Sequence, residues 1–428
     1  MSHENASSWK QTIIAAMTSY IDAGSIVAGA AGLSLWQAYL GMDGLQLGLL
    51  ASLSSNAASA AVGALIGGRL CDAYGRKFVY TYDLLVYIVG MLLIVFAFNF
   101  PMLLIGYIIV GLGVGADVVA SWTLIAEQAP AKDRAKHCGS AQFAWALGPA
   151  IVLLMSAYLN TFGLIGNRIV FAHLILVAAW VWYQRLKMPE SNDWKKAHEE
   201  EKRLVAEGKI KKLSYGELLS NAINLKTVIF LICVYSVWNL CASTWGFFMP
   251  YIFENVAKLS NTMSQVMSVG SFVLSIFGTY FIFMKFGDRI SRRLIYFVIG
   301  GIYVIAWSVW ILPPESLASW MLFMFVIFAG INNGSGQQAF YQLWCSELFP
   351  TKYRATAQGL TFFITRIICS VWVFCAPLIM ESLGFRYAAM LITCFALISW
   401  LVGSIWAPKT QGKTLREIEI ERYGEEVH

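Results

Sequence analysis

Residues 70–77 read LCDAYGRK, and the stretch FGDRISRR at residues 286–293 repeats their pattern of charges. A second pair of motifs follows in the same order: EQAPAKDR at 127–134 and ELFPTKYR at 347–354. The paired residues lie 216, 220 or 219 positions apart: Asp72 and Asp288, Arg76 and Arg292, Glu127 and Glu347, Pro130 and Pro350, Arg134 and Arg354, Pro189 and Pro408. Motif pairs in one order with nearly constant spacing indicate an internal duplication.

The composition predicts an all-α integral membrane protein. Of the 428 residues 58% are hydrophobic and 13% are charged, whereas soluble domains carry roughly 25% charged residues. Apolar stretches of about 20 residues are long enough to cross a bilayer as helices. Twelve are predicted, at 12–36, 45–68, 78–98, 101–125, 138–160, 164–184, 226–254, 264–284, 294–313, 316–344, 356–379 and 385–406.

Lysine and arginine positions predict the orientation of these helices. With both termini cytoplasmic, the basic residues fall on the cytoplasmic side except Arg168, Lys258, Arg366 and Arg386. Such asymmetry follows the positive-inside rule and predicts a multi-pass protein of the bacterial inner membrane. It also accounts for the net charge of +6, so no nucleic-acid partner is expected.

The longest polar segment divides the apolar chain six helices to six. We expect an N-terminal six-helix bundle at 1–184, a cytoplasmic linker with interfacial helices at 185–225, a C-terminal bundle at 226–406 and a cytoplasmic tail at 407–428. Two pseudo-symmetric six-helix bundles are the layout of a transporter that alternates access around a central site.

The motifs carry a family resemblance across essentially the whole chain. GGRLCDAYGRK resembles the loop signature of the major facilitator superfamily, and ELFPTKYRATAQG, MPES, DAGSIVAG and APKTQGKTLREIE are similar to its sugar-porter branch. The resemblance implies a gating network that locks the two bundles together, formed by Asp72, Arg76, Glu127, Arg134, Asp288, Arg292, Glu347 and Arg354. The alternative is that these charges only set the topology.

Three charges are predicted to lie near the bilayer midplane. A rise of 1.5 Å per residue places Asp22 and Arg366 about 18 Å, and Asp117 about 15 Å, from the cytoplasmic edge. Ionisable residues at this depth are costly and mark functional sites. The resemblance implies that Asp22 is a proton-coupling acid, although Tyr107 replaces the arginine that usually modulates it. Asp117 is a second proton-coupling candidate, or a structural contact between helices.

Substrate-binding candidates come from the same resemblance. Gln142 aligns with a glutamine that binds sugar in the family, Arg366 aligns with a cavity-facing tryptophan, and helix ten, NNGSGQQAFYQLWCSE, is rich in amides. The predicted substrate-binding residues are Gln142, Trp238, Asn239, Gln337, Gln338, Tyr341, Gln342 and Arg366. Each amide could instead make an interhelical hydrogen bond, and Arg366 could instead pair with Asp22 or Asp117.

We therefore predict proton-coupled symport of a small polyhydroxylated solute, with a preference for a sugar acid because Arg366 is a midplane cation. A neutral sugar or polyol, carried by a symporter or a facilitator, is the alternative. A transporter-like sensor without net flux is the alternative from another class. The sequence has no catalytic triad, metal cluster or phosphate loop, so we expect neither an enzyme nor a cofactor. The expected partners are the solute, protons and the lipid bilayer, and the expected state is a monomer.

Overall fold

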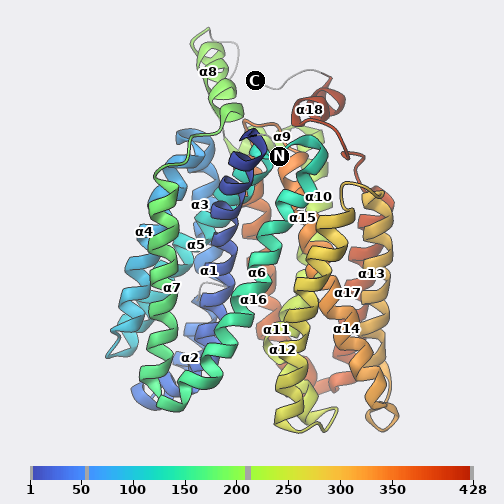
Figure 1. The fold of residues 1–428 in the computed structure, drawn as a ribbon. Helices are drawn as coiled ribbons and strands as arrows, with labels where there is room; N and C mark the ends of the chain where they lie inside the picture. The colour runs from blue at the N-terminus through green and yellow to red at the C-terminus, as the bar shows by residue number, and fades with distance from the viewer. Residues whose placement is uncertain (1–2, 54–56, 208–213, 425–428) are drawn as a thin grey trace.

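The computed structural model describes residues 3–53, 57–207 and 214–424, and within these ranges the chain is helical and contains no strand. Figure 1 shows a bundle of long, roughly parallel helices with both termini at one end, where α8 and α18 also lie. We call this the terminal end. Long apolar runs fold as helices because lipid offers the backbone no hydrogen-bond partners.

Residues 3–185 are called the N-half, and residues 222–406 the C-half. The N-half contains α1 (His3–Leu40), α2 (Gly44–Leu53), α3 (Ala58–Tyr74), α4 (Arg76–Val95), α5 (Phe100–Gln128), η1 (Ala131–Asp133), α6 (Arg134–Leu159), η2 (Asn160–Phe162) and α7 (Leu164–Arg185). Between the halves lie α8 (Asn192–Ala206) and α9 (Tyr215–Ser220).

The C-half contains α10 (Ala222–Leu231), η3 (Ile232–Ser236), α11 (Val237–Asn255), α12 (Asn261–Phe277), η4 (Gly278–Met284), α13 (Arg292–Ser308), η5 (Val309–Ile311), η6 (Pro314–Ser316), α14 (Ser319–Ser335), α15 (Gln337–Glu347), α16 (Arg354–Leu383) and α17 (Phe385–Trp406). The tail carries α18 (Leu415–Tyr423).

The described residues contain ten helices that are long and apolar enough to cross a membrane. The other two predicted spans are not among these ten. The described residues of the segment predicted at 45–68 form α2 and α3, on either side of residues 54–56, which lie outside the described ranges. The segment predicted at 316–344 breaks at Gly336, between α14 and α15. With these two segments the chain has the twelve-helix architecture that the sequence predicted.

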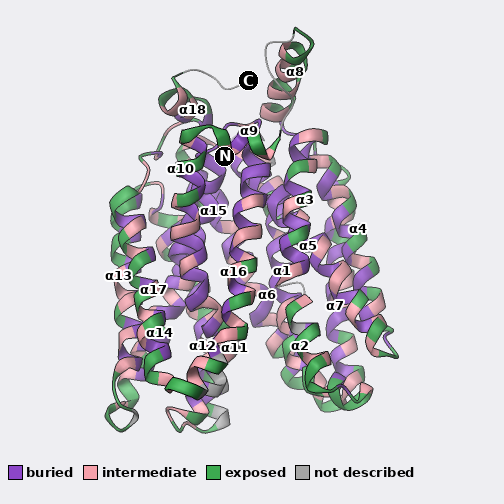
Figure 2. Ribbon diagram, turned by 180° about the vertical axis from the view of Figure 1, so that it is seen from behind, coloured by how far each residue is buried: buried purple, intermediate pink, exposed green. Residues whose placement is uncertain are grey.

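The halves approach most closely where α3 crosses α16 near the terminal end. A Cβ added to Gly68 would lie 2.3 Å from the carbonyl oxygen of Ala355, and one added to Gly359 would lie 2.3 Å from that of Ala64. Only small residues allow such backbone contact between helices. Figure 2 shows buried residues concentrated where helices face one another and exposed residues along the outside.

Candidate functional site: a central cavity and two charged clusters

The first charged cluster joins the N-half to the start of α16. Arg76 lies 3.0 Å from Asp72 and 2.8 Å from Glu127. Arg354 of the C-half lies 2.7 Å from the same Glu127 oxygen. The backbone N–H of Thr356 donates to Asp72 Oδ2 at 2.7 Å. The Asp72 carboxylate thus sits at the N-terminus of a helix from the other half, where free N–H groups and the helix dipole favour negative charge.

The second cluster repeats this arrangement with the halves exchanged. Arg292 lies 3.0 Å from Asp288 and 2.8 Å from Glu347, and Arg134 of the N-half lies 3.1 Å from Glu347. The backbone N–H groups of Ala135 and of the next residue each donate to Asp288 at 3.0 Å. Each half therefore supplies a carboxylate that binds the first turn of a helix in the other half. These contacts join the two halves at the terminal end.

The linker covers the first cluster. Glu190 of the MPES motif accepts hydrogen bonds from the N–H groups of Arg76 and Lys77, at 3.2 and 3.0 Å, and so binds the N-terminus of α4. Asp193 follows at the start of α8, and its burial, together with the Glu127 charge, raises the pKa of its carboxyl group.

The tail covers the second cluster. Arg292 donates to the Thr410 hydroxyl at 2.8 Å, and Arg134 donates to the Lys413 carbonyl at 3.0 Å. A capping box that begins at Thr414 then starts α18. The MPES and APKTQGK motifs, which the duplication relates, thus cover equivalent clusters.

A cavity of about 160 Å³ lies between the halves. Its N-half wall is formed by α1 and α6 and is mostly apolar: Ala23, Ile26, Val27, Ala30, Trp145 and Pro149. Its C-half wall carries polar and aromatic side chains, including Asn239, Ser243, Asn333, Gln338 and Arg366. Hydrogen bonds to a bound solute would therefore come mainly from the C-half.

Four of the predicted substrate-binding residues line this cavity: Trp238, Asn239, Gln338 and Arg366. The Trp238 indole also donates to Asn332 at 3.0 Å, which fixes the ring in the wall. The Arg366 guanidinium lies 4.6 Å from the centre of the Phe362 ring, an arrangement in which the ring face attracts the cation.

The other four lie outside the described lining: Gln142, Gln337, Tyr341 and Gln342. Gln142 donates across the halves to the Asn333 carbonyl at 2.7 Å. Gln337 accepts from Asn332 at 2.8 Å, and Tyr341 stacks on Tyr235 with ring centres 3.7 Å apart. Gln342 is buried. Gln142 and Tyr341 therefore contact the lining residues Asn333 and Tyr235 without lining the cavity themselves.

Asp22 is buried in α1 directly before Ala23, which lines the cavity. Among the described residues its Oδ1 atom has no hydrogen-bond partner. The charged groups that act on it are Arg366, of opposite sign, and Asp117, of like sign. Arg366 of the C-half is therefore the cation whose charge acts on Asp22.

Asp117 belongs to a different environment, inside the N-half. Its Oδ1 atom lies 2.8 Å from Nη1 of Arg185, which is also 3.7 Å from Asp83. Sequence reasoning missed both partners. Arg185 is the first residue of the predicted linker, where it resembles a topology-setting charge. Asp83 lies within the predicted span 78–98 and, like Asp22, is an ionisable residue inside a membrane helix.

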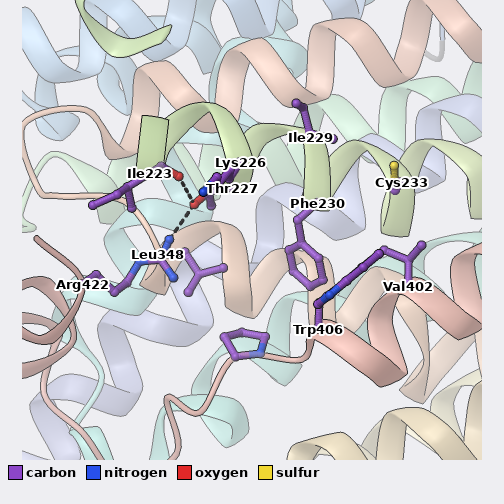
Figure 3. A pocket seen from close by; sticks show the side chains of 11 residues that line it. Ile223, Lys226, Thr227, Ile229, Phe230, Cys233, Leu348, Val402, Trp406 and Arg422 are labelled. Carbon is purple, nitrogen blue, oxygen red and sulfur yellow. Dashed lines mark hydrogen bonds between the residues drawn. The ribbon is translucent and has the colours of Figure 1, made fainter. Parts of the chain in front are cut away.

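A larger pocket of about 480 Å³ lies at the terminal end of the C-half. Figure 3 shows Phe230, Val402 and Trp406 around it, with Arg422 hydrogen-bonded to Thr227 and Thr227 to Ile223. Its described lining includes no N-half residue. A site used in alternating access lies between the two halves, so the smaller central cavity is the better candidate for a solute.

Comparisons with known proteins agree with this geometry. The model of the Major Facilitator Superfamily matches residues 12–373. The minor myo-inositol transporter IolF of Bacillus subtilis (strain 168) is 50% identical over 97% of this chain and 94% of its own length. The glucose transporter GlcP of Staphylococcus epidermidis is 24% identical over 86% of this chain and 87% of its own length. The structure of the proton:xylose symporter XylE bound to 6-bromo-6-deoxy-D-glucose superposes with a TM-score of 0.80 at 16% identity, covering 98% of this chain and 100% of that one.

Proposed function

Since the chain belongs to the Major Facilitator Superfamily of membrane transporters, we propose that it imports a small neutral polyol of the myo-inositol type together with protons. Two features carry this proposal. A cavity is lined by residues of both halves, and ion pairs between the halves close the terminal end. Alternating access requires a site of this kind. With the termini in the cytoplasm of a bacterial cell, as the basic residues predict, this arrangement is closed on the cytoplasmic side.

The size and chemistry of the cavity support a small polyhydroxylated solute. Its volume of about 160 Å³ is below the roughly 300–1,000 Å³ of sites for drug-sized ligands. Amide side chains such as Asn239 and Gln338 offer both donors and acceptors, which suits hydroxyl groups. The relative that is 50% identical is named for myo-inositol, a neutral polyol.

Neither the relatives nor the electrostatics of the cavity supports the preference for a sugar acid. IolF and GlcP are named for neutral solutes. Arg366, the basis of that preference, has Asp22 as an opposite charge acting across the cavity wall. While Asp22 is ionised, its charge offsets that of the guanidinium, so the presence of Arg366 does not by itself indicate an anionic solute.

The same pair supports proton coupling. A proton on Asp22 removes its attraction for Arg366, which leaves the guanidinium donors available to solute hydroxyls. Proton binding and solute binding would then favour each other, as symport requires. Arg366 would serve both as partner of the carboxylate and as ligand of the solute.

Uptake of labelled myo-inositol into proteoliposomes under an imposed pH gradient tests this proposal. We expect accumulation of myo-inositol and little uptake of a sugar acid such as glucuronate. Asp22→Asn should retain counterflow and lose accumulation, whereas Asp43→Asn, an exposed carboxylate outside the cavity, should behave like the wild type. If Asp22→Asn still concentrates the solute, Asp22 does not carry the proton. Uptake of glucuronate alone, abolished by Arg366→Ala, would replace the neutral solute with an anion. Binding without uptake would support a sensor.

A further inference from the structure

Asp83, Asp117 and Arg185 form a buried cluster in the N-half that the transport cycle described above does not use. Arg185 Nη1 lies 2.8 Å from Asp117 and 3.7 Å from Asp83, and the three residues are only 1–5% exposed. Arg185 also donates to Thr18 of α1 and, at 3.1 Å, to Ser121 of α5. The cluster thus joins four helices of one half.

The charges in this cluster do not balance. An arginine side chain stays protonated in proteins, so two carboxylates share one positive charge. The charged and titratable groups facing Asp83 among the described residues are Asp117 from α5, Arg185 from α7, Cys71 from α3 and Tyr80 from its own helix. None of them supplies a second cation. A buried net negative charge is costly in a membrane, and one bound proton removes it.

The contacts indicate which carboxyl holds that proton. Asp117 Oδ1 accepts from both Arg185 and Ser121, at 2.8 and 2.7 Å, as an ionised carboxylate does. Asp83 lies farther from the guanidinium, and its Oδ2 atom has no hydrogen-bond partner among the described residues. Asp83 is therefore the better position for a proton.

The C-half folds without such a cluster. The offsets of the duplicated motifs relate Asp83 to Ile299, Asp117 to Gln337 and Arg185 to Ser404. All three counterparts are buried, and the Asn332 amide donates to both the Ile299 carbonyl and Gln337. Since neutral residues fill equivalent positions of the same fold, the fold alone does not require the charges of the N-half.

The cluster lies between Asp22 and the terminal end. Asp83 is seven residues after the start of α4, about 10 Å from that end by the helical rise, compared with about 18 Å for Asp22. Thr18 lies one helical turn from Asp22 on α1 and is 2.8 Å from Ser121, which donates to Asp117 at 2.7 Å. Hydroxyl groups therefore line the route from α1 to the cluster.

We propose that the Asp83–Asp117–Arg185 cluster is a second proton-binding site, at which Asp83 holds the proton on its way from Asp22 to the terminal end. When the terminal end opens, water takes the proton that Asp83 holds as hydronium. The Asp83 carboxylate then gains the proton that the Asp22 carboxyl loses, and Asp22 becomes a carboxylate whose charge is opposite to that of Arg366. The route rests on the proposed symport, whereas protonation of Asp83 rests only on the geometry of the cluster.

Infrared spectroscopy of the purified full-length protein tests the protonation without any transport. The wild type at neutral pH should show the C=O stretching band of a protonated carboxyl that Asp83→Asn removes and that Asp22→Asn and Asp43→Asn retain. Asp117→Asn leaves one carboxylate and one guanidinium, so Asp83 should ionise and the band should again be lost. A spectrum in which this band survives both Asp83→Asn and Asp117→Asn overturns the proposal.

Transport tests the route in the same proteins. In Asp83→Asn, accumulation of myo-inositol driven by a pH gradient should fall more than counterflow, which moves no net proton. An equal fall in both activities would contradict a role in proton movement. If the wild type shows no accumulation driven by a pH gradient, the proposed symport fails, and the infrared result still decides whether Asp83 binds a proton.

Discussion

At the terminal end, Asp72 of the N-half and Asp288 of the C-half occupy equivalent positions, and each accepts hydrogen bonds from the first turn of a helix in the other half. In the interior, equivalent positions differ: the N-half has Asp83, Asp117 and Arg185 where the C-half has Ile299, Gln337 and Ser404. Closure depends on contacts that cross between the halves, so each half must keep matching charges. The Asp83–Asp117–Arg185 cluster lies within one half, so its chemistry can differ between the halves.

The two walls of the central cavity also differ between the halves. Its apolar wall comes from the N-half and most of its hydrogen-bonding side chains come from the C-half, whereas the unbalanced buried carboxylates lie in the N-half. If the proposed roles are correct, the C-half supplies most of the solute contacts and the N-half supplies the proton-binding carboxylates. Three pairs of substitutions at equivalent positions would break or sharpen this comparison.

The largest effect is expected for Arg185→Ala. The change leaves two buried carboxylates without their cation, which should lower the free energy of unfolding by about 3–5 kcal/mol. Ser404→Ala, at the equivalent position of the C-half, should change the free energy of unfolding by less than about 1 kcal/mol because it leaves no buried charge without a partner. Thermal unfolding of both purified variants measures the difference. Equal destabilisation would mean that the two interiors are energetically alike.

A smaller and symmetric effect is expected for Asp72→Asn and Asp288→Asn. Each change weakens charge-assisted hydrogen bonds across the halves, which should destabilise the closed terminal end by about 1.5–3 kcal/mol. Electron-spin distance measurements between labels at Lys132 and Arg289, exposed positions on the two halves, should show a larger open population in both variants. A response from only one of them would contradict the equivalence of the two clusters.

The smallest effect is expected for alanine substitutions at two equivalent glycines, Gly359 and Gly139. A Cβ on Gly359 would lie 2.3 Å from the backbone oxygen of Ala64, whereas one on Gly139 would lie 2.5 Å from the Cγ atom of Met284. A methionine side chain can move aside but a helix backbone cannot. Gly359→Ala should therefore disfavour the closed arrangement by about 1–3 kcal/mol, and Gly139→Ala by less. The same spin labels measure both variants, and a larger opening for Gly139→Ala would refute this account.

Much of the architecture was predictable because it depends on local composition. Apolar runs of membrane-spanning length predict helices wherever they occur, and the repeated motifs predict two related bundles. The family is confirmed by the match over residues 12–373 and by a relative of 50% identity. The break at Gly336 was not predicted, because the hydropathy of a segment does not reveal where its helix is interrupted.

The candidate site was only partly predictable. The repeated motifs identified the eight residues of the two charged clusters. Their spacing could not show that Asp72 and Asp288 bind helix termini of the opposite half. Alignment named Gln142, and the amide-rich helix ten named Tyr341, as solute ligands, although their side chains contact Asn333 and Tyr235 and lie outside the cavity lining. Which face of a helix meets the cavity depends on its rotation within the bundle, which packing sets.

The sequence by itself determined that this protein is a duplicated, twelve-helix membrane transporter with charges buried at midplane depth, because length, hydropathy and motif spacing are properties of the chain. Only the tertiary structure decided how those charges pair. Depth along a helix follows from counting residues, and it placed Asp22, Asp117 and Arg366 at one level. Lateral position does not follow from counting, so only the packed helices reveal that Asp117 shares Arg185 with Asp83 inside the N-half.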